Sequence, residues 1–395
     1  MRQALSDGPM LAMMAMQMVI WAALFYSFPA SILYWQAEFG WSTGQTMGAF
    51  TLAIAISALG APVAGRLIDR GFSPLIFPLG AVTGAALLIA LTYVETLGQF
   101  YMIWALIGIC MSVTLYEPCF ALLTRARGAR ARGTITAVTL LAGFASTLAY
   151  PMIYALAEPF GWRIAILAMA GLVLAINLPL SLFAVNRFEV EARVRQQQEP
   201  AQPKSAAAPK VLLRDKRYWL IAGSFAAATL TTGVFINLLL PLMAAQGVPS
   251  SLSILAASMI GPSQVLGRLL MLGAGARLSS IRIAQIAMVS IAFGAFMFAA
   301  SGQFALLVLV FALAQGVGFG VAGIVRAVVT RDYLGEENYG AVAGSVALPS
   351  LMISALAPAL GAFALDQSGP LPVILLCLIA PILGAIGLGR LGKSA

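Results

Sequence analysis

The chain has 395 residues, of which 61% are apolar and only 9% are charged, and its formal net charge is +9. Soluble domains carry roughly 45–50% apolar and about 25% charged residues, so this composition excludes a water-soluble fold. The composition instead indicates an all-α integral membrane protein whose outer surface faces the lipid bilayer.

Twelve apolar stretches of membrane-spanning length follow one another along the chain. Crossing ~30 Å of hydrocarbon takes about 20 helical residues. The predicted spans are 12–35, 43–64, 74–94, 101–123, 135–157, 163–185, 218–242, 252–275, 281–300, 303–327, 339–364 and 371–389.

The charges are distributed asymmetrically around these spans. With the N-terminus inside, twenty of the 23 Lys and Arg residues fall in cytoplasmic segments. The outer loops instead carry acids, at Glu38, Glu95, Glu158 and Asp366. This is the positive-inside pattern, which predicts cytoplasmic N- and C-termini in a bacterial cytoplasmic (inner) membrane. The basic excess therefore reflects topology, and we expect no nucleic-acid partner.

A polar segment, residues 186–217, divides the spans six and six. It contains QQQEPAQPKSAAAPK and shows no apolar period, so we predict a flexible cytoplasmic linker. The predicted organisation is an N-terminal six-helix half at 1–185, this linker, and a C-terminal six-helix half at 218–395.

An internal repeat supports two pseudo-symmetric halves. The fourth span ends FALLTRARG and the tenth ends IVRAVVTRD, and Gly65-Arg66-Leu67 of the second span matches Gly267-Arg268-Leu269 of the eighth. Two six-helix halves are a recognised transporter plan, with substrate bound between them near mid-bilayer.

The sequence lacks the motifs of common enzyme and metal sites. There is no histidine, and Cys110 and Cys119 are nine residues apart, on opposite faces of one helix, so they cannot chelate one metal ion together. Nothing resembles a phosphate-binding loop or a nucleophile elbow. We expect no enzymatic activity, no cofactor and no metal, and an ion or substrate gradient as the energy source.

The stretch Gly65-Arg66-Leu67-Ile68-Asp69-Arg70-Gly71 resembles the signature loop of the major facilitator superfamily. The resemblance implies the major facilitator fold, in which Gly65 allows close helix approach and Asp69 and Arg70 form a cytoplasmic gate latch. Compared with the family pattern, the second glycine comes one position early and the following basic residues are missing.

Three further stretches look like the monocarboxylate and oxalate/formate porter branch. They are Phe39-Gly40-Trp41-Ser42, Gly161-Trp162-Arg163 and Gly261-Pro262-Ser263-Gln264, the last leading to Arg268. The resemblance implies that Arg268 binds a substrate carboxylate. Gln264 stands where the branch often has a proton-coupling aspartate, which puts coupling through that pair in doubt.

Ionisable residues inside a span cost at least ~2.5–3.5 kcal/mol each and usually face the protein interior or a wet cavity. Arg268 suits an organic anion because a guanidinium binds a carboxylate with two hydrogen bonds. The alternative is that Arg268 repeats Arg66 and belongs to the cytoplasmic gate.

Glu117, in Tyr116-Glu117-Pro118, is the acid placed within a span. Pro118 is expected to make the helix irregular there, and a desolvated carboxyl is a candidate proton-coupling site. The alternative is a structural ion pair or helix contact.

Arg326 and Gln315 share one face of the tenth span, because eleven helical residues return to within ~20°. Arg326 is a second candidate anion ligand or a partner for Glu117, although it can also snorkel to the inner surface.

Neutral polar residues within the spans are weaker indicators of a substrate cavity than the charged ones. Ser31 and Tyr34 in the first span and Asn237 in the seventh are candidate lining residues, with helix packing as the alternative for each.

The sequence therefore predicts an alternating-access secondary transporter of a small organic anion, a monocarboxylate, together with a proton or counter-substrate, acting as a monomer. Two alternatives stay open: an efflux pump for drugs or metalloids, and a non-transporting membrane receptor or assembly protein.

Overall fold

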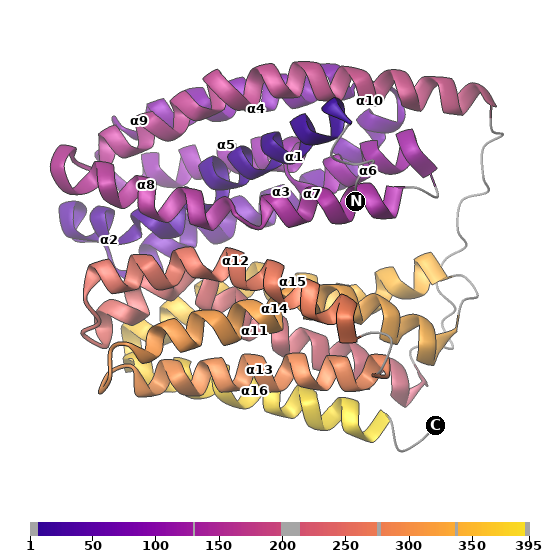
Figure 1. Ribbon diagram of the computed structural model, residues 1–395. Coiled ribbons are helices and arrows are strands. Elements are labelled where there is room, and N and C mark those ends of the chain that lie inside the picture. The colour runs from indigo at the N-terminus through magenta and orange to yellow at the C-terminus, as the bar shows by residue number, and fades with distance from the viewer. Residues whose placement is uncertain (1–6, 129–130, 199–213, 275–277, 336–338, 392–395) are drawn as a thin grey trace. The chain divides into compact units, whose positions relative to one another are not determined.

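The computed structural model describes residues 7–128, 131–198, 214–274, 278–335 and 339–391. These residues form helices and short connections, and contacts within the chain divide it into unit 1, Met1–Gln202, and unit 2, Pro203–Ala395. Within each unit the helices run alongside one another (Figure 1).

Unit 1 contains six spans, several of which are built from more than one helix. The helices in chain order are α1 (Gly8–Trp21), η1 (Ala22–Tyr26), α2 (Ser27–Phe39), α3 (Thr43–Asp69), α4 (Ser73–Leu91), α5 (Leu97–Thr114), α6 (Tyr116–Arg127), α7 (Ala131–Ala142), α8 (Ala145–Phe160), α9 (Trp162–Leu172), η3 (Val173–Asn177) and α10 (Leu178–Gln198). Both η segments are π-helical turns that continue the helix around them.

Unit 2 contains six further spans, each a single helix. They are α11 (Lys216–Ala245), α12 (Ser250–Ala274), α13 (Ser280–Ala300), α14 (Leu307–Leu334), α15 (Tyr339–Ser368) and α16 (Pro370–Leu391). Among the described residues, twelve helical segments are long and apolar enough to cross a membrane, which confirms the predicted twelve-helix architecture.

The sixth span departs from its prediction. It was expected to end at residue 185, but α10 continues to Gln198, so the prediction of a flexible linker is wrong for residues 186–198. Residues 199–213 of the predicted linker lie outside the described residues.

The physical reason is a short apolar stripe among charged residues. Val185, Phe188 and Ala192 are spaced three and four residues apart and are fully buried, as one face of a helix requires. The Arg127 guanidinium lies 4.8 Å from the centre of the Phe188 ring. This end of α10 is therefore a packed helix with a polar outer face.

Glycines bring the second and fourth spans of each unit into close contact. In unit 1 a Cβ atom on Gly108 of α5 would lie 2.9 Å from Ala53 Cα of α3. In unit 2 a Cβ atom on Gly320 of α14 would lie 2.8 Å from Gln264 Cα of α12. Small residues at helix contacts are typical of membrane proteins, and their recurrence here gives the internal repeat a structural counterpart.

Aromatic side chains fill the core away from these glycine contacts. In unit 1 Phe28 stacks on Phe50 at 4.4 Å and meets the edge of Trp104 at 4.6 Å. In unit 2 Phe235 lies 4.9 Å from Phe298 and 4.8 Å from Phe311. Ring pairs at these separations add roughly 0.5–1.5 kcal/mol each beyond their buried area.

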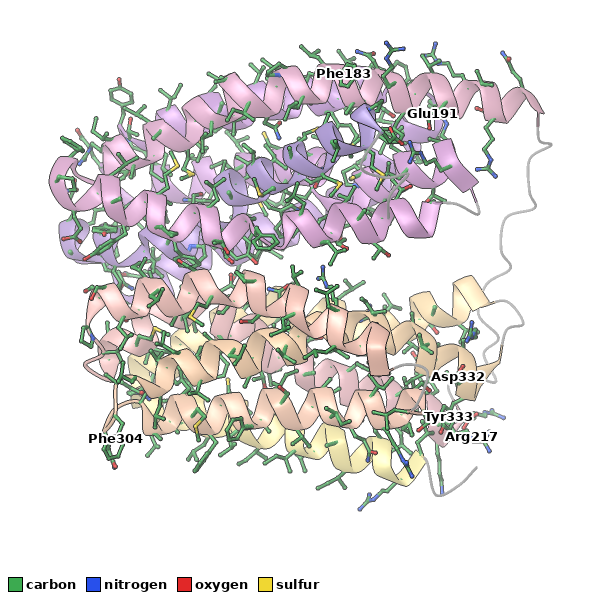
Figure 2. The ribbon with its side chains drawn as sticks, in the orientation of Figure 1. Phe183, Glu191, Arg217, Phe304, Asp332 and Tyr333 are labelled. Atoms are coloured by element: carbon green, nitrogen blue, oxygen red, sulfur yellow. The ribbon has the colours of Figure 1, made fainter. Side chains whose placement is uncertain are left out.

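The outer surface is apolar along the helices and polar at their ends (Figure 2). Phe183 on α10 is 45% exposed, an exposure that suits contact with lipid tails rather than water. Glu191 lies near the end of α10, and Arg217, Asp332 and Tyr333 lie together at one end of unit 2 (Figure 2). These ends are called the charged end of each unit below.

Gly320→Val is predicted to destabilise the protein, because its added side chain would overlap the main chain of α12 at Gln264. Overpacking of this kind costs about 1–3 kcal/mol. The measurement is the thermal unfolding midpoint of the purified protein in detergent. Gly323→Val is the matched control on the same helix, because no atom lies within 4 Å of a Cβ atom there. Equal lowering of the midpoint by both substitutions would contradict the close-contact account.

Candidate functional site

The fourth span is broken near its middle, as the Tyr116-Glu117-Pro118 sequence predicts. α5 ends at Thr114, and Leu115 is extended with φ −81° and ψ −154° before α6 begins. Pro118 has no N–H to donate to the carbonyl of Thr114, four residues earlier, and its ring collides with that carbonyl in a regular helix. The break therefore leaves the Thr114 carbonyl without its helical donor.

Gln17 of α1 supplies the missing donor. Its side-chain Nε2 donates to the Thr114 carbonyl at 2.8 Å, and the Gln17 side chain is fully buried. An unbonded buried carbonyl costs roughly 1–3 kcal/mol, so this contact stabilises the break and ties α1 to α5. Gln17 is not among the residues predicted from the sequence, where its only local signal is that it is polar within an apolar, methionine-rich span.

Glu117 lies in the first turn of α6 and is exposed. The positive end of the α6 dipole favours a negative charge at this position.

Aromatic rings surround the start of α6. The Tyr116 ring lies 4.5 Å from Trp21 of α1 and 5.0 Å from Phe120. Trp21 immediately precedes the π-helical turn Ala22–Tyr26, and such turns are frequent at functional sites. The buried Trp21 Nε1 has no hydrogen-bond partner among the described residues.

In unit 2, Arg268 is fixed against a neighbouring helix. Arg268 of α12 is half-buried, and its Nε donates to the Gly320 carbonyl of α14 at 3.3 Å. This bond needs the close α12–α14 approach at Gly320. Arg66, the equivalent of Arg268 in the internal repeat, is exposed and its side chain forms no ion pair with a described residue, so the two arginines are not structurally equivalent.

Gln264, one turn before Arg268, is buried where α12 meets α14. Arg326 lies on α14 and is half-buried. Gln315, predicted to share its face, is fully buried and its Nε2 donates to Thr232 Oγ1 at 3.4 Å. The structure therefore places Gln315 in the interior of unit 2, while Arg326 is partly accessible.

Two buried amide oxygens in unit 2 lack partners among the described residues. Asn237 Nδ2 donates to the Gly233 carbonyl at 2.7 Å, but Asn237 Oδ1 accepts no described hydrogen bond. Gln315 Oε1 is likewise without a partner among the described residues. Buried acceptors of this kind are rare, and water or a hydrogen-bonding ligand is the usual explanation.

Ser31 and Tyr34 have different surroundings. Ser31 is fully buried, and its Oγ has no partner among the described residues. The Tyr34 hydroxyl donates to Glu158 Oε1 at 3.1 Å. Nearby, Arg163 Nη2 lies 2.7 Å from Glu38 Oε1, so the two aromatic motifs before the second and sixth spans meet through an ion pair.

The gate residues do not form the expected latch within unit 1. A Cβ atom on Gly65 would meet nothing within 4 Å, so the close approach expected there is not found. Asp69 and Arg70 are exposed and make no ion pair with a described residue of their unit. The close approach lies at Gly71, whose φ is +86° and whose Cβ atom would lie 3.0 Å from Glu189 Oε1.

Glu189 of α10 is the centre of an ion-pair network at the charged end of unit 1. Arg125 Nη1 lies 2.7 Å from Glu189 Oε2, and Arg193 Nε lies 3.2 Å from Glu189 Oε1. Arg127 pairs with Asp7 and, at 3.3 Å, with Glu191. Glu189 is only 3% exposed, so this network of ion pairs holds α6 and α10 together next to the turn at Gly71.

The charges of the fourth, eighth and tenth spans each lie in the second half of their helices. Glu117, Arg268 and Arg326 each lie five or six residues beyond the midpoint of Leu97–Arg127, Ser250–Ala274 and Leu307–Leu334, respectively. This offset is about 7–9 Å toward the carboxyl end of each helix. Charges at this depth within apolar helices are expected to face a wet pathway.

Comparisons with known proteins agree with this architecture. The chain is similar to two solved structures of the nucleoside transporter NupG, and each comparison covers 98% of both chains. For NupG itself the sequence identity is 13% and the TM-score is 0.73. For a point mutant of NupG the identity is 15% and the TM-score is 0.69. At this identity the likeness shows the fold alone. No curated protein is significantly similar in sequence. Residues 10–345 match the family model described as Major Facilitator Superfamily. The chain therefore belongs to the Major Facilitator Superfamily of membrane transporters.

Proposed function

We propose that this transporter moves a small organic anion, a monocarboxylate, by alternating access. The observation that carries the proposal is the charge of the spans: Arg268 and Arg326 supply two cations from the second halves of neighbouring helices of unit 2, and unit 1 supplies Glu117. Cationic groups within a span attract an anion, and a carboxylate accepts two parallel hydrogen bonds from a guanidinium.

Arg268 is the proposed carboxylate ligand. Its Nε contact with the Gly320 carbonyl fixes the plane of the guanidinium, which lowers the entropy lost when an anion binds. Gln264 cannot titrate, so in this proposal the proton moves through Glu117, which is exposed and attached to the broken fourth span.

The two units are the proposed moving halves, and residues 199–213 belong to the proposed linker. The charged ends are proposed to face the cytoplasm of a bacterial cell, because they gather the basic residues. The protein is proposed to act as a monomer.

A neutral polar solute of the nucleoside kind is the second candidate substrate. The oxygens of Asn237 and Gln315 that lack described partners favour it, because they are suited to accept hydrogen bonds from amine or hydroxyl groups. The likeness in fold to the nucleoside transporter NupG gives it weaker support.

The function is tested by counterflow in proteoliposomes with labelled lactate, formate, oxalate and uridine, with and without a pH gradient. The proposal expects exchange of at least one carboxylate and none of uridine. Uridine exchange without carboxylate exchange supports the second candidate. Extrusion of a cationic dye without exchange of any of the four solutes supports an efflux pump.

Arg268→Lys is predicted to raise the apparent KM for the exchanged carboxylate roughly tenfold or more, because an ammonium cannot bind both oxygens in one plane. A tenfold change corresponds to about 1.4 kcal/mol, within the range for a charged hydrogen bond. Arg282→Lys, at an exposed position of α13, is the matched control and should keep the wild-type KM. A wild-type KM in Arg268→Lys would assign Arg268 to the gate instead.

Glu117→Gln is predicted to retain counterflow but to lose acceleration by a pH gradient, because an amide cannot carry the proton. Initial uptake rates with and without the gradient measure this effect. Glu95→Gln, an exposed acid outside the helices, should respond like the wild type. Full pH-gradient dependence in Glu117→Gln would remove Glu117 from coupling.

A further inference from the structure

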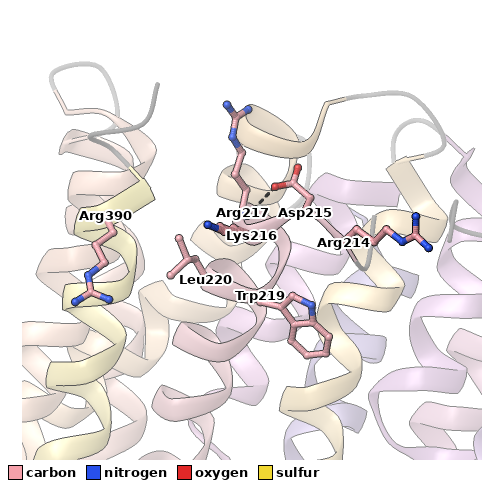
Figure 3. Close-up of a pocket in the computed structure, with 7 residues that line it drawn as sticks. All are labelled: Arg214, Asp215, Lys216, Arg217, Trp219, Leu220 and Arg390. Carbon is pink, nitrogen blue, oxygen red and sulfur yellow. Dashed lines mark hydrogen bonds between the residues drawn. The ribbon is translucent and has the colours of Figure 1, made fainter. Parts of the chain in front are cut away.

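A cationic pocket lies at the charged end of unit 2, where α11 begins and α16 ends (Figure 3). Its volume is about 800 Å³. The lining includes four basic residues, one acid and an aromatic ring, namely Arg214, Lys216, Arg217, Arg390, Asp215 and Trp219. None of them belongs to the proposed substrate pathway, so the pocket requires a separate explanation.

The acid of the pocket does not neutralise its bases. Asp215 Oδ1 accepts a hydrogen bond from the Arg217 backbone N–H at 2.8 Å and caps α11. The lining therefore carries an excess of three positive charges. Arg214, Lys216 and Arg217 have exposed side chains and form no ion pair with a described residue. The positive end of the α11 dipole adds to this local charge.

In unit 1, basic residues at the charged end form ion pairs with acidic side chains. There Arg125 pairs with Glu189, and Arg127 pairs with Asp7 and Glu191. In unit 2, Arg331 pairs with Asp332 at 3.4 Å, and the final helix, α16, has a basic residue, Arg390, in its last turn. A local excess of positive over negative charge is the usual condition for binding an external anion.

The apolar part of the lining indicates the kind of anion. Trp219 lies within the first turns of α11 and is 55% exposed, the position typical of an indole at a membrane interface. Figure 3 shows the Trp219 ring below the charged side chains of Arg214 and Arg217, further along α11. A ligand with a phosphate head and an apolar tail would contact both parts, since bases beside the membrane attract anionic headgroups.

We propose that this pocket binds the phosphate headgroup of an anionic membrane lipid. The four basic side chains would supply the positive charge that attracts the phosphate, and Trp219 would contact the first carbons of the acyl chains. The site is distinct from the proposed substrate pathway, and its occupancy does not depend on which solute the protein moves.

Native mass spectrometry of the purified full-length protein tests the proposal, with phosphatidylglycerol and phosphatidylcholine added at equal concentrations. The wild type is expected to retain phosphatidylglycerol at roughly tenfold lower lipid concentration than phosphatidylcholine, since each base near the phosphate favours the anionic lipid. Equal retention of the two lipids would overturn the proposal without the need for any variant.

A matched pair of double variants locates the site. Arg217→Gln with Arg390→Gln is expected to weaken phosphatidylglycerol retention roughly tenfold or more. Arg187→Gln with Arg282→Gln removes the same two charges from exposed positions outside the pocket and should leave retention unchanged. Arg217→Lys with Arg390→Lys keeps the charge and should keep the lipid, which separates loss of binding from misfolding. An equal loss in both Gln pairs would contradict the assignment.

A competition experiment distinguishes a lipid ligand from a soluble phosphate ligand. Inorganic pyrophosphate at millimolar concentration is expected to leave phosphatidylglycerol bound, because it has no apolar part to contact Trp219. Displacement of the lipid at micromolar pyrophosphate would overturn the lipid assignment and point to a soluble phosphate ligand.

Discussion

The hydrocarbon interior of a membrane offers no water, so every backbone N–H and C=O group must find its partner within the protein. The spans meet most of this requirement through their own helical bonds, although several contain an internal proline, such as Pro62 in α3 and Pro262 in α12. In the fourth span Pro118 removes the donor for Thr114. Gln17 replaces that donor from another span, and Asn177 donates to the Met16 carbonyl at 2.6 Å beside it. Two buried amides therefore hold α1 where the fourth span is irregular.

The positions of the charged residues depend on the same requirement. Because the fourth span is broken, α6 begins at Tyr116, and Glu117 lies in its first turn. In unit 2 the contact between α12 and α14 depends on a missing side chain at Gly320, and this contact brings the Gly320 carbonyl within reach of Arg268. The charge of unit 1 is thus positioned by a helix break and that of unit 2 by a close helix contact, although the two units repeat the same order of spans.

Much of the fold could be predicted from the sequence because span length and apolar content are local properties. The irregular helix at Pro118 was also predicted, although Pro62 and Pro262 lie within helices that continue past them. The extension of α10 was missed because Val185, Phe188 and Ala192 form a narrow stripe among charged neighbours. Gly71, not Gly65, makes the close approach, because that depends on the position of Glu189 on a distant helix.

The candidate site could be predicted only in part. Intramembrane charges such as Arg268 and Glu117 stand out in an apolar sequence. Their partners do not, because Gln17 and Thr114 are 97 residues apart, and Arg125 and Glu189 are 64 apart. Gly161-Trp162-Arg163 is one of the stretches that suggested a porter branch, and in the structure its Arg163 pairs with Glu38. The substrate is selected by contacts from side chains of several spans, and the sequence of one span does not show which side chains of the others lie beside it.

The central claim is that Glu117, Arg268 and Arg326 face a water-filled pathway. Accessibility labelling tests it most directly, with single cysteines at these three positions in a chain whose Cys110, Cys119 and Cys377 are replaced by serine or alanine. The account predicts that a charged, membrane-impermeant thiol reagent modifies all three positions from at least one side of the membrane. Positions that resist this reagent from both sides but react with a lipid-soluble one would contradict the account.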